Sequence, residues 1–281
     1  VANPNYYDET SSQYQKALPF IHRLDLADLY QTGVANTTNV SFSKSGKDHS
    51  TRISFTNSQR DGILQNSDAV RRFLGIKSVF KPAEWMNVSL DYKYTYRRNH
   101  NSANQDYGGT GNVVYSNTQW GQTQVDLSDY KDYLRPDGTW RTWNPISKDN
   151  LTANYHDNPY ATLDNINRYN TNRFSVFTGD VEFILPYNFK AGVRTSGSIR
   201  NYLSETSRNE GSINFSSYYG QTQYYTSDLT VQGRLTWSDR FMEDRLSVDA
   251  AAFIEERQYH YKTLSANTSD GLIMPGYFNL A

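Results

Sequence analysis

The sequence predicts an all-β protein whose antiparallel strands form a segment of a transmembrane β-barrel. Residues 87–98 give the first reason, because apolar and charged side chains alternate there with a period of two. Val88 and Leu90 fall on one face, whereas Asp91 and Lys93 fall on the other. The same alternation returns along the chain, and short connections alternate with long ones. An apolar stripe about ten residues long suits a tilted strand that crosses a bilayer.

Composition excludes several classes of protein. The 281 residues carry a net charge of −1, which gives no bulk attraction for nucleic acid. Mean hydropathy is −0.77, and no apolar run approaches the roughly 18 residues of a membrane helix. Barrel strands escape that limit because half of their side chains face a polar interior. Cysteine is absent, so disulfides and thiolate metal sites are excluded. Aromatic residues make up 15% of the chain, which suits interfacial girdles or carbohydrate contacts.

Residues 1–35 are expected to be an extracellular loop segment that leads into the barrel. Two short helices are predicted within it, over residues 12–18 and 24–30. Asp25 and Asp28 are suited to the first turn of the second helix, where carboxylates interact favourably with the helix dipole.

We expect eight strands within residues 36–256, an even set of hairpins that forms an arc of a barrel rather than a whole one. The alternating runs that predict them lie at residues 39–43, 52–56, 70–80, 87–98, 172–185, 189–200, 229–237 and 245–255. Short connections are expected at 81–84, 186–188 and 238–244, and long ones at 99–168, 201–224 and 257–281, the last being the start of a further extracellular loop. An outer-membrane barrel shows this asymmetry, with long extracellular loops at one end and short turns at the other.

The long loop over residues 99–168 concentrates aromatic side chains among Asn and Asp. Aromatic rings beside amides and carboxylates suit sugar stacking. They equally suit packing of the loop on itself or on a protein partner, which is the interpretation we favour. The candidate substrate- or partner-binding residues are Tyr107, Trp120, Tyr133, Trp140, Trp143 and Tyr160.

The polar faces of the predicted strands carry more basic than acidic side chains. A solvated wall of the barrel lumen is the simpler interpretation, and contact with an internal plug domain or an anionic solute is the alternative. The residues expected to face the lumen or the plug are Asp91, Lys93, Arg97, Arg194 and Arg234.

No motif for catalysis or for a cofactor is present. The five histidines do not fall at metal-ligand spacing. Residues 108–111 are rich in glycine but lack the lysine and the strand–helix context of a phosphate-binding loop. Carboxylates are scattered, and no pair is favoured as the acid and base of a glycosidase. We therefore expect a protein that is not an enzyme and that uses no metal or cofactor.

Short motifs spread over nearly the whole chain are weak singly but fairly specific in their order and spacing. They are residues 29–33 with 39–43, residues 61–67, Trp85, Asn158-Pro159-Tyr160 and residues 275–280. In that order they resemble an early barrel strand, a first outer hairpin loop, a short periplasmic turn and two further loop motifs of one family. That family is the SusC/RagA group of TonB-dependent outer-membrane transporters of Bacteroidota.

The resemblance implies a 22-stranded barrel in the bacterial outer membrane, closed by an N-terminal plug and energised by TonB. It implies nutrient uptake with a SusD-like surface lipoprotein, with oligosaccharides or peptides as substrates. The chain shows no signal peptide, plug or TonB-contact sequence, so we expect an interior fragment, with TonB acting through the missing N-terminal region. The expected partners are therefore the lipoprotein, TonB, outer-membrane lipid and a glycan or peptide, but not nucleic acid.

Two alternatives remain open from the sequence. A soluble all-β carbohydrate-binding module would place loops of similar length at both ends of its sheet, which the alternation of short and long connections opposes. A β-rich glycoside hydrolase would need two carboxylates that converge in a cleft.

Overall fold

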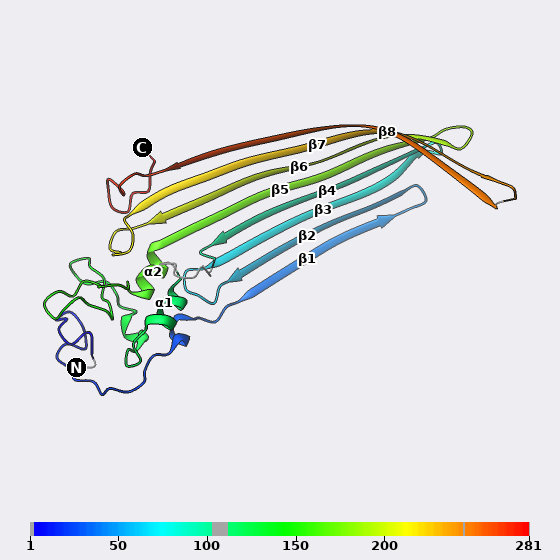
Figure 1. The fold of residues 1–281 in the computed structure, drawn as a ribbon. Coiled ribbons are helices and arrows are strands. Elements are labelled where there is room, and N and C mark those ends of the chain that lie inside the picture. Colours follow the sequence, from blue (N-terminus) through cyan, green and yellow to red (C-terminus); the bar gives the residue numbers. More distant parts are fainter. Residues whose placement is uncertain (1–2, 103–111, 244, 281) are drawn as a thin grey trace.

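Eight antiparallel strands form a single sheet, with a body of loops and short helices at one end (Figure 1). The computed structural model describes residues 3–102, 112–243 and 245–280. The strands follow one another in chain order and each pairs with the next, so the predicted eight-stranded antiparallel arrangement is confirmed. Their bounds are β1 Ala35–Ser45, β2 His49–Asp61, β3 Asp68–Ala83, β4 Met86–His100, β5 Ile166–Ile184, β6 Phe189–Arg208, β7 Tyr218–Phe241 and β8 Leu246–Asn267.

One side of the sheet, which carries Val88, Leu90 and Tyr92, is apolar and open; we call it the apolar face. Cross-strand register aligns its side chains into rows, one of which contains Phe42, Ile53, Ile76, Tyr92 and Phe177. Val40 is 63% exposed and Leu90 is 44% exposed, since no second sheet covers them within the described residues. A soluble monomer rarely leaves so extended an apolar surface uncovered.

The connections at one end of the sheet are tight turns, two of which contain consecutive residues with positive φ. Tyr187 and Asn188, between β5 and β6, have φ angles of +61° and +65°. Met242 and Glu243, which begin the turn from β7 to β8, have φ angles of +57° and +54°. Two successive residues with positive φ match the right-handed twist of the strands that they join, and asparagine tolerates that conformation.

Aromatic rings gather at the tight-turn end. Trp85 stacks on Phe183 with 6.0 Å between ring centroids. Trp237 lies 6.3 Å from Phe189 and 6.2 Å from Phe241. Amphipathic rings at one edge of an apolar band are typical of a membrane interface.

Several strands run further toward the loop end than the alternation predicts, and β6, β7 and β8 do so most. The expected long loop over residues 201–224 is wrong, because β6 continues to Arg208 and β7 already begins at Tyr218. The expected end of the strands at residue 256 is also too early, since β8 continues to Asn267. Polar residues are mixed with Tyr and Leu on both faces of these extensions, so the period of two disappears from the sequence while the strands stay paired.

The leading segment is less helical than predicted. Residues 12–15 form turns and residues 16–18 are irregular instead of helical, and Gln15 has a φ of +57°, which is incompatible with a right-handed helix. The second predicted helix shrinks to one 3₁₀ turn, η1 (Leu26–Leu29). Asp25 caps this turn, because its side chain accepts a hydrogen bond from the Ala27 backbone N–H.

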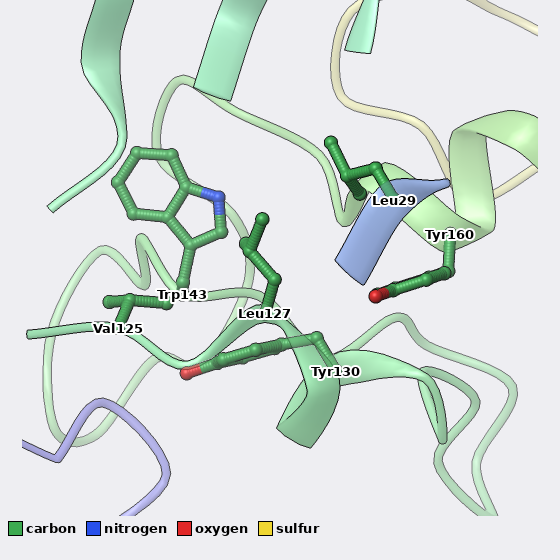
Figure 2. Close-up of a cluster of buried hydrophobic side chains, with 6 residues drawn as sticks. All are labelled: Leu29, Val125, Leu127, Tyr130, Trp143 and Tyr160. Atoms are coloured by element: carbon green, nitrogen blue, oxygen red, sulfur yellow. The ribbon is translucent and has the colours of Figure 1, made fainter. Parts of the chain in front are cut away.

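The stretch predicted as a long loop contains helix α1 (Val113–Trp120), the 3₁₀ turn η2 (Leu127–Tyr130) and helix α2 (Pro159–Asn165). These elements and the leading segment form the loop body, residues 3–34 and 112–165. Its core is a cluster of buried side chains drawn from both parts (Figure 2): Leu29, Val125, Leu127, Tyr130, Trp143 and Tyr160. Within the described residues no helix is long and apolar enough to cross a membrane.

Candidate functional site

A buried charge network joins the two parts of the loop body. Asp8 is 2% exposed, and its carboxylate accepts a hydrogen bond of 2.8 Å from Arg135 Nε and lies 3.3 Å from Arg141 Nε. Arg141 also donates to the Thr10 carbonyl at 2.9 Å. Burial acts to raise the pKa of Asp8, but hydrogen bonds from Thr10 and Arg135 outweigh it and hold that pKa below its ordinary value. The charged form of Asp8 therefore stabilises the loop body.

The Asn158-Pro159-Tyr160 motif begins α2. Asn158 is fully buried; its Oδ1 accepts from the backbone N–H groups of Tyr160 and Ala161, and its Nδ2 donates to the Tyr130 carbonyl at 2.9 Å. Pro159 occupies the first helical turn, where a missing N–H is harmless. The Tyr160 hydroxyl donates to the Asp28 carbonyl at 2.9 Å. The motif thus ties α2 to both η2 and the leading segment.

Most of the predicted aromatic site residues pack inside the loop body. Trp140, Trp143 and Tyr160 are 8%, 3% and 2% exposed, and Tyr133 lies edge-on to Trp140 at 6.4 Å. Side chains this buried cannot stack on a ligand, so their placement favours the packing interpretation. Tyr107 lies outside the described residues.

Trp120 is the exception, because it ends α1 at the surface and is 59% exposed. It borders a hollow of about 230 Å³, the aromatic hollow. The His156 ring lies between Trp120 at 6.1 Å and the buried Trp143 at 5.4 Å. The stack of three rings fixes the orientation of Trp120 from below, while its outer side faces solvent.

Polar groups surround the rings of the aromatic hollow. Asp157 accepts hydrogen bonds from the Ser212 hydroxyl at 2.6 Å and from Asn214 Nδ2 at 3.0 Å, so it anchors the loop between β6 and β7. Burial lowers the pKa of His156 below its ordinary value, although Asp157 acts in the opposite direction. The imidazole is therefore neutral near pH 7, and its Nδ1 lies 3.1 Å from Ser116 Oγ. Tyr155, 69% exposed, completes the rim.

The chemistry of the aromatic hollow is that of recognition. Exposed rings next to hydroxyl, amide and carboxylate groups suit a small ring or an apolar side chain with polar edges. Among the described residues that line the aromatic hollow, Asp157 is the one carboxylate, whereas a glycosidase requires a pair. The described residues also contain no cluster of three or more His, Asp or Glu that could hold a metal ion.

A larger hollow of about 750 Å³ lies where the chain enters β1. Exposed Val34 and Ile63 line it together with residues of the turn from β2 to β3. The rings of Tyr30 and Tyr115 and the polar side chain of His100 also belong to its lining. Of the predicted aromatic site residues that the structure describes, none lines this hollow, so it is the weaker candidate.

The residues predicted to face the lumen share one side of the sheet, opposite the apolar face, and we call this side the polar face. The cross-strand register between β4, β5, β6 and β7 shows that all five lie on this side. They are Asp91, Lys93, Arg97, Arg194 and Arg234.

Acidic side chains on β5 compensate the arginines of the polar face. Arg234 donates to Asp180 at 2.9 Å and to Glu182 at 3.2 Å, while Arg194 donates to Asp180 at 3.0 Å. Gly192, on the strand between, leaves room for this contact, since a Cβ there would lie 3.2 Å from Arg234 Cζ. Paired in this way, the two arginines offer little free charge to an anionic solute, which favours the solvated wall.

Sequence reasoning missed Tyr155, His156, Asp157 and Asn214 at the aromatic hollow. Asn214 lies in a different loop from Trp120, and no periodicity relates the two. The sequence did contain one indication of this site, because Tyr155, His156 and Asp157 directly precede Asn158. Asn158 caps α2 and is buried, so it holds the residues before it in a fixed position at the surface.

No protein-family model matches the chain, and no curated protein matches it. Three similar solved structures are of one system. They are the RagAB peptide transporter (TM-score 0.70, 14% identity) and the RagAB peptide importer in the "closed-closed" state (0.64, 13%) and the "open-open" state (0.66, 14%). The matches cover 99%, 99% and 96% of this chain and 31% of each transporter chain.

At identities of 13–14%, the likeness shows the fold: this chain has the fold of a segment of those transporter chains. It spans about a third of their length. The predicted fold class, an all-β antiparallel segment of a barrel, is thereby confirmed, with the sheet open at β1 and β8 in the described residues.

Proposed function

We propose that this chain is the transmembrane wall and extracellular loop region of a SusC/RagA-like, TonB-dependent importer in a bacterial outer membrane. The observation that carries the proposal is the exposed apolar face, which is backed by a polar face and bordered by aromatic rings. Lipid covers the first, and the water-filled or plugged lumen meets the second. The likeness in fold to peptide transporter chains supports the same assignment.

The transported substrates are oligosaccharides or peptides, taken up together with a SusD-like lipoprotein and driven by TonB. The aromatic hollow is a subsite on the extracellular side, and its volume of about 230 Å³ suits one sugar ring or one apolar side chain. The protein acts by binding and conformational change, not by catalysis. Peptide import by the structural neighbours favours peptides, and the exposed rings suit either class.

Fractionation of cells that express the whole protein tests the membrane assignment. We expect it in the outer membrane, soluble only in detergent, and migrating faster on a gel before boiling than after. Recovery from the periplasm without detergent would refute the assignment and would favour a soluble carbohydrate-binding module. Growth of a deletion strain on single peptides or glycans as the sole nutrient then identifies the substrate class.

A further inference from the structure

The apolar face ends, toward the loop end, at a row of hydrogen-bond donors that we call the donor row. Register aligns one residue from each strand: Thr38, Asn57, Arg72, Tyr96, Arg173, Asn201, Tyr225 and Lys262. Three of the eight are cationic and none is a carboxylate. The row beneath it on the same face, two residues nearer the tight turns, is apolar across β1 to β4 and mixed across β5 to β8. Its members are Val40, Phe55, Leu74, Tyr94, Ser175, Ile199, Ser227 and His260.

Two arginines of the donor row carry charge that the protein does not neutralise. Arg72 and Arg173 flank Tyr96, and each guanidinium carbon lies 5.8 Å from the ring centroid. Both side chains are exposed, and neither forms an ion pair within the described residues. By contrast, Arg98, which lies two residues closer to the loop end than Tyr96 on the same face, forms an ion pair with Asp68 at 2.9 Å. Two guanidinium groups held beside one ring attract an anion from outside.

We propose that the donor row binds the phosphate groups of lipid headgroups in the outer leaflet. This inference rests on the membrane assignment above. The position of the row decides between a lipid and a free phosphate ion, because the anion site borders the apolar face directly. A phosphorylated lipid can place its headgroup on Arg72 and Arg173 while its acyl chains cover Leu74 and Tyr94. Guanidinium groups bind phosphate oxygens through paired hydrogen bonds, and the Tyr96 ring holds both arginines in place.

A pair of double variants isolates this surface. Arg72→Gln/Arg173→Gln removes two charges from the donor row. Arg52→Gln/Arg71→Gln removes the same charge from exposed arginines of the polar face, which faces away from lipid in the proposal. The whole protein, purified in detergent, is mixed with diphosphorylated lipid A, with the same lipid after removal of its phosphates, or with inorganic phosphate. Bound lipid is counted by native mass spectrometry, and the thermal midpoint is recorded.

We expect diphosphorylated lipid A to bind the wild type and to raise its thermal midpoint. The donor-row variant should bind at least about fivefold less of this lipid. The polar-face variant should behave as wild type, and the dephosphorylated lipid should bind weakly to all three. Equal binding of the two lipids, or full binding by the donor-row variant, overturns the proposal. A midpoint shift from inorganic phosphate as large as that from lipid A also overturns it.

Failure of this inference is distinguishable from failure of the proposed function. Heat-modifiable migration of both double variants shows that each barrel is folded. If the protein fractionates with the outer membrane but shows no dependence on lipid phosphate, only the donor-row proposal falls. If it is soluble without detergent, the membrane assignment falls first.

Discussion

A single buried carboxylate, Asp8, joins the first residues of the chain to the loop between β4 and β5. Its pKa is held below the ordinary value, so its contribution to stability is present above about pH 4 and is lost as the pH falls through its pKa in the folded protein. We expect Asp8→Asn to destabilise the loop body by about 3–5 kcal/mol at pH 7, because it leaves Arg135 and Arg141 buried without their charge partner.

Limited proteolysis of the whole protein between pH 3 and pH 7 measures this effect. Wild type should become susceptible in the loop body only at the acidic end, whereas Asp8→Asn should be susceptible throughout. Asp149→Asn is the control, since its pair with Lys148 is exposed and screened by solvent, and so contributes little to stability. A wild-type cleavage pattern in Asp8→Asn would show that the network is dispensable.

Trp120 and Trp143 belong to one stack but differ in exposure, and we expect their substitutions to separate binding from folding. Trp120→Ala should weaken substrate binding about two- to tenfold with little loss of stability, because an exposed ring contributes mainly to its ligand. Trp143→Ala should destabilise the loop body by about 3–5 kcal/mol. Isothermal titration with the identified substrate and thermal unfolding give the two readouts. Unchanged substrate affinity in Trp120→Ala would show that the aromatic hollow is not a subsite for the transported substrate.

The sequence predicts strands well where the two faces of the sheet have opposite polarity, as on β4. The eight strands of the apolar band are found for this reason. The extensions of β6, β7 and β8 are not, because neither of their faces is consistently apolar: polar pairs such as Thr222 with Ser265 are mixed with Tyr and Leu. The order within the loop body also escapes prediction, since it depends on contacts such as Asp8 with Arg135 between residues far apart in the chain.

Neighbouring residues of β4 test which face meets lipid. Leu90 lies on the apolar face, midway between Met86 and Tyr94, and Ser89 lies on the opposite face beside Asp180. We expect Leu90→Arg to destabilise the barrel by about 2–4 kcal/mol, because it places a charge in hydrocarbon. Ser89→Arg should change stability by less than about 0.5 kcal/mol, since it faces water and an acidic neighbour. Urea unfolding in lipid vesicles measures both, and the reverse order would invert the two faces.

The short turns and the loop body lie at opposite ends of the sheet (Figure 1). In the proposed membrane assignment, a bilayer around the apolar face separates these two ends. The 281 residues contain no cysteine, which permits single reporter cysteines at both ends. Lys47 lies in the turn between β1 and β2, and Lys148 lies in the loop body; both are exposed. We expect a membrane-impermeant maleimide to label Lys148→Cys but not Lys47→Cys on intact cells, because only the loop body is extracellular in the proposed orientation.

Permeabilising the outer membrane supplies the control, since both variants should then be labelled to the same extent. Labelling of Lys47→Cys alone on intact cells would reverse the orientation, while leaving the barrel in the membrane. Equal labelling of both variants before permeabilisation would mean that no bilayer separates the two ends of the sheet. The apolar face would then need a protein partner to cover it, and the importer assignment would fail together with the lipid site at the donor row.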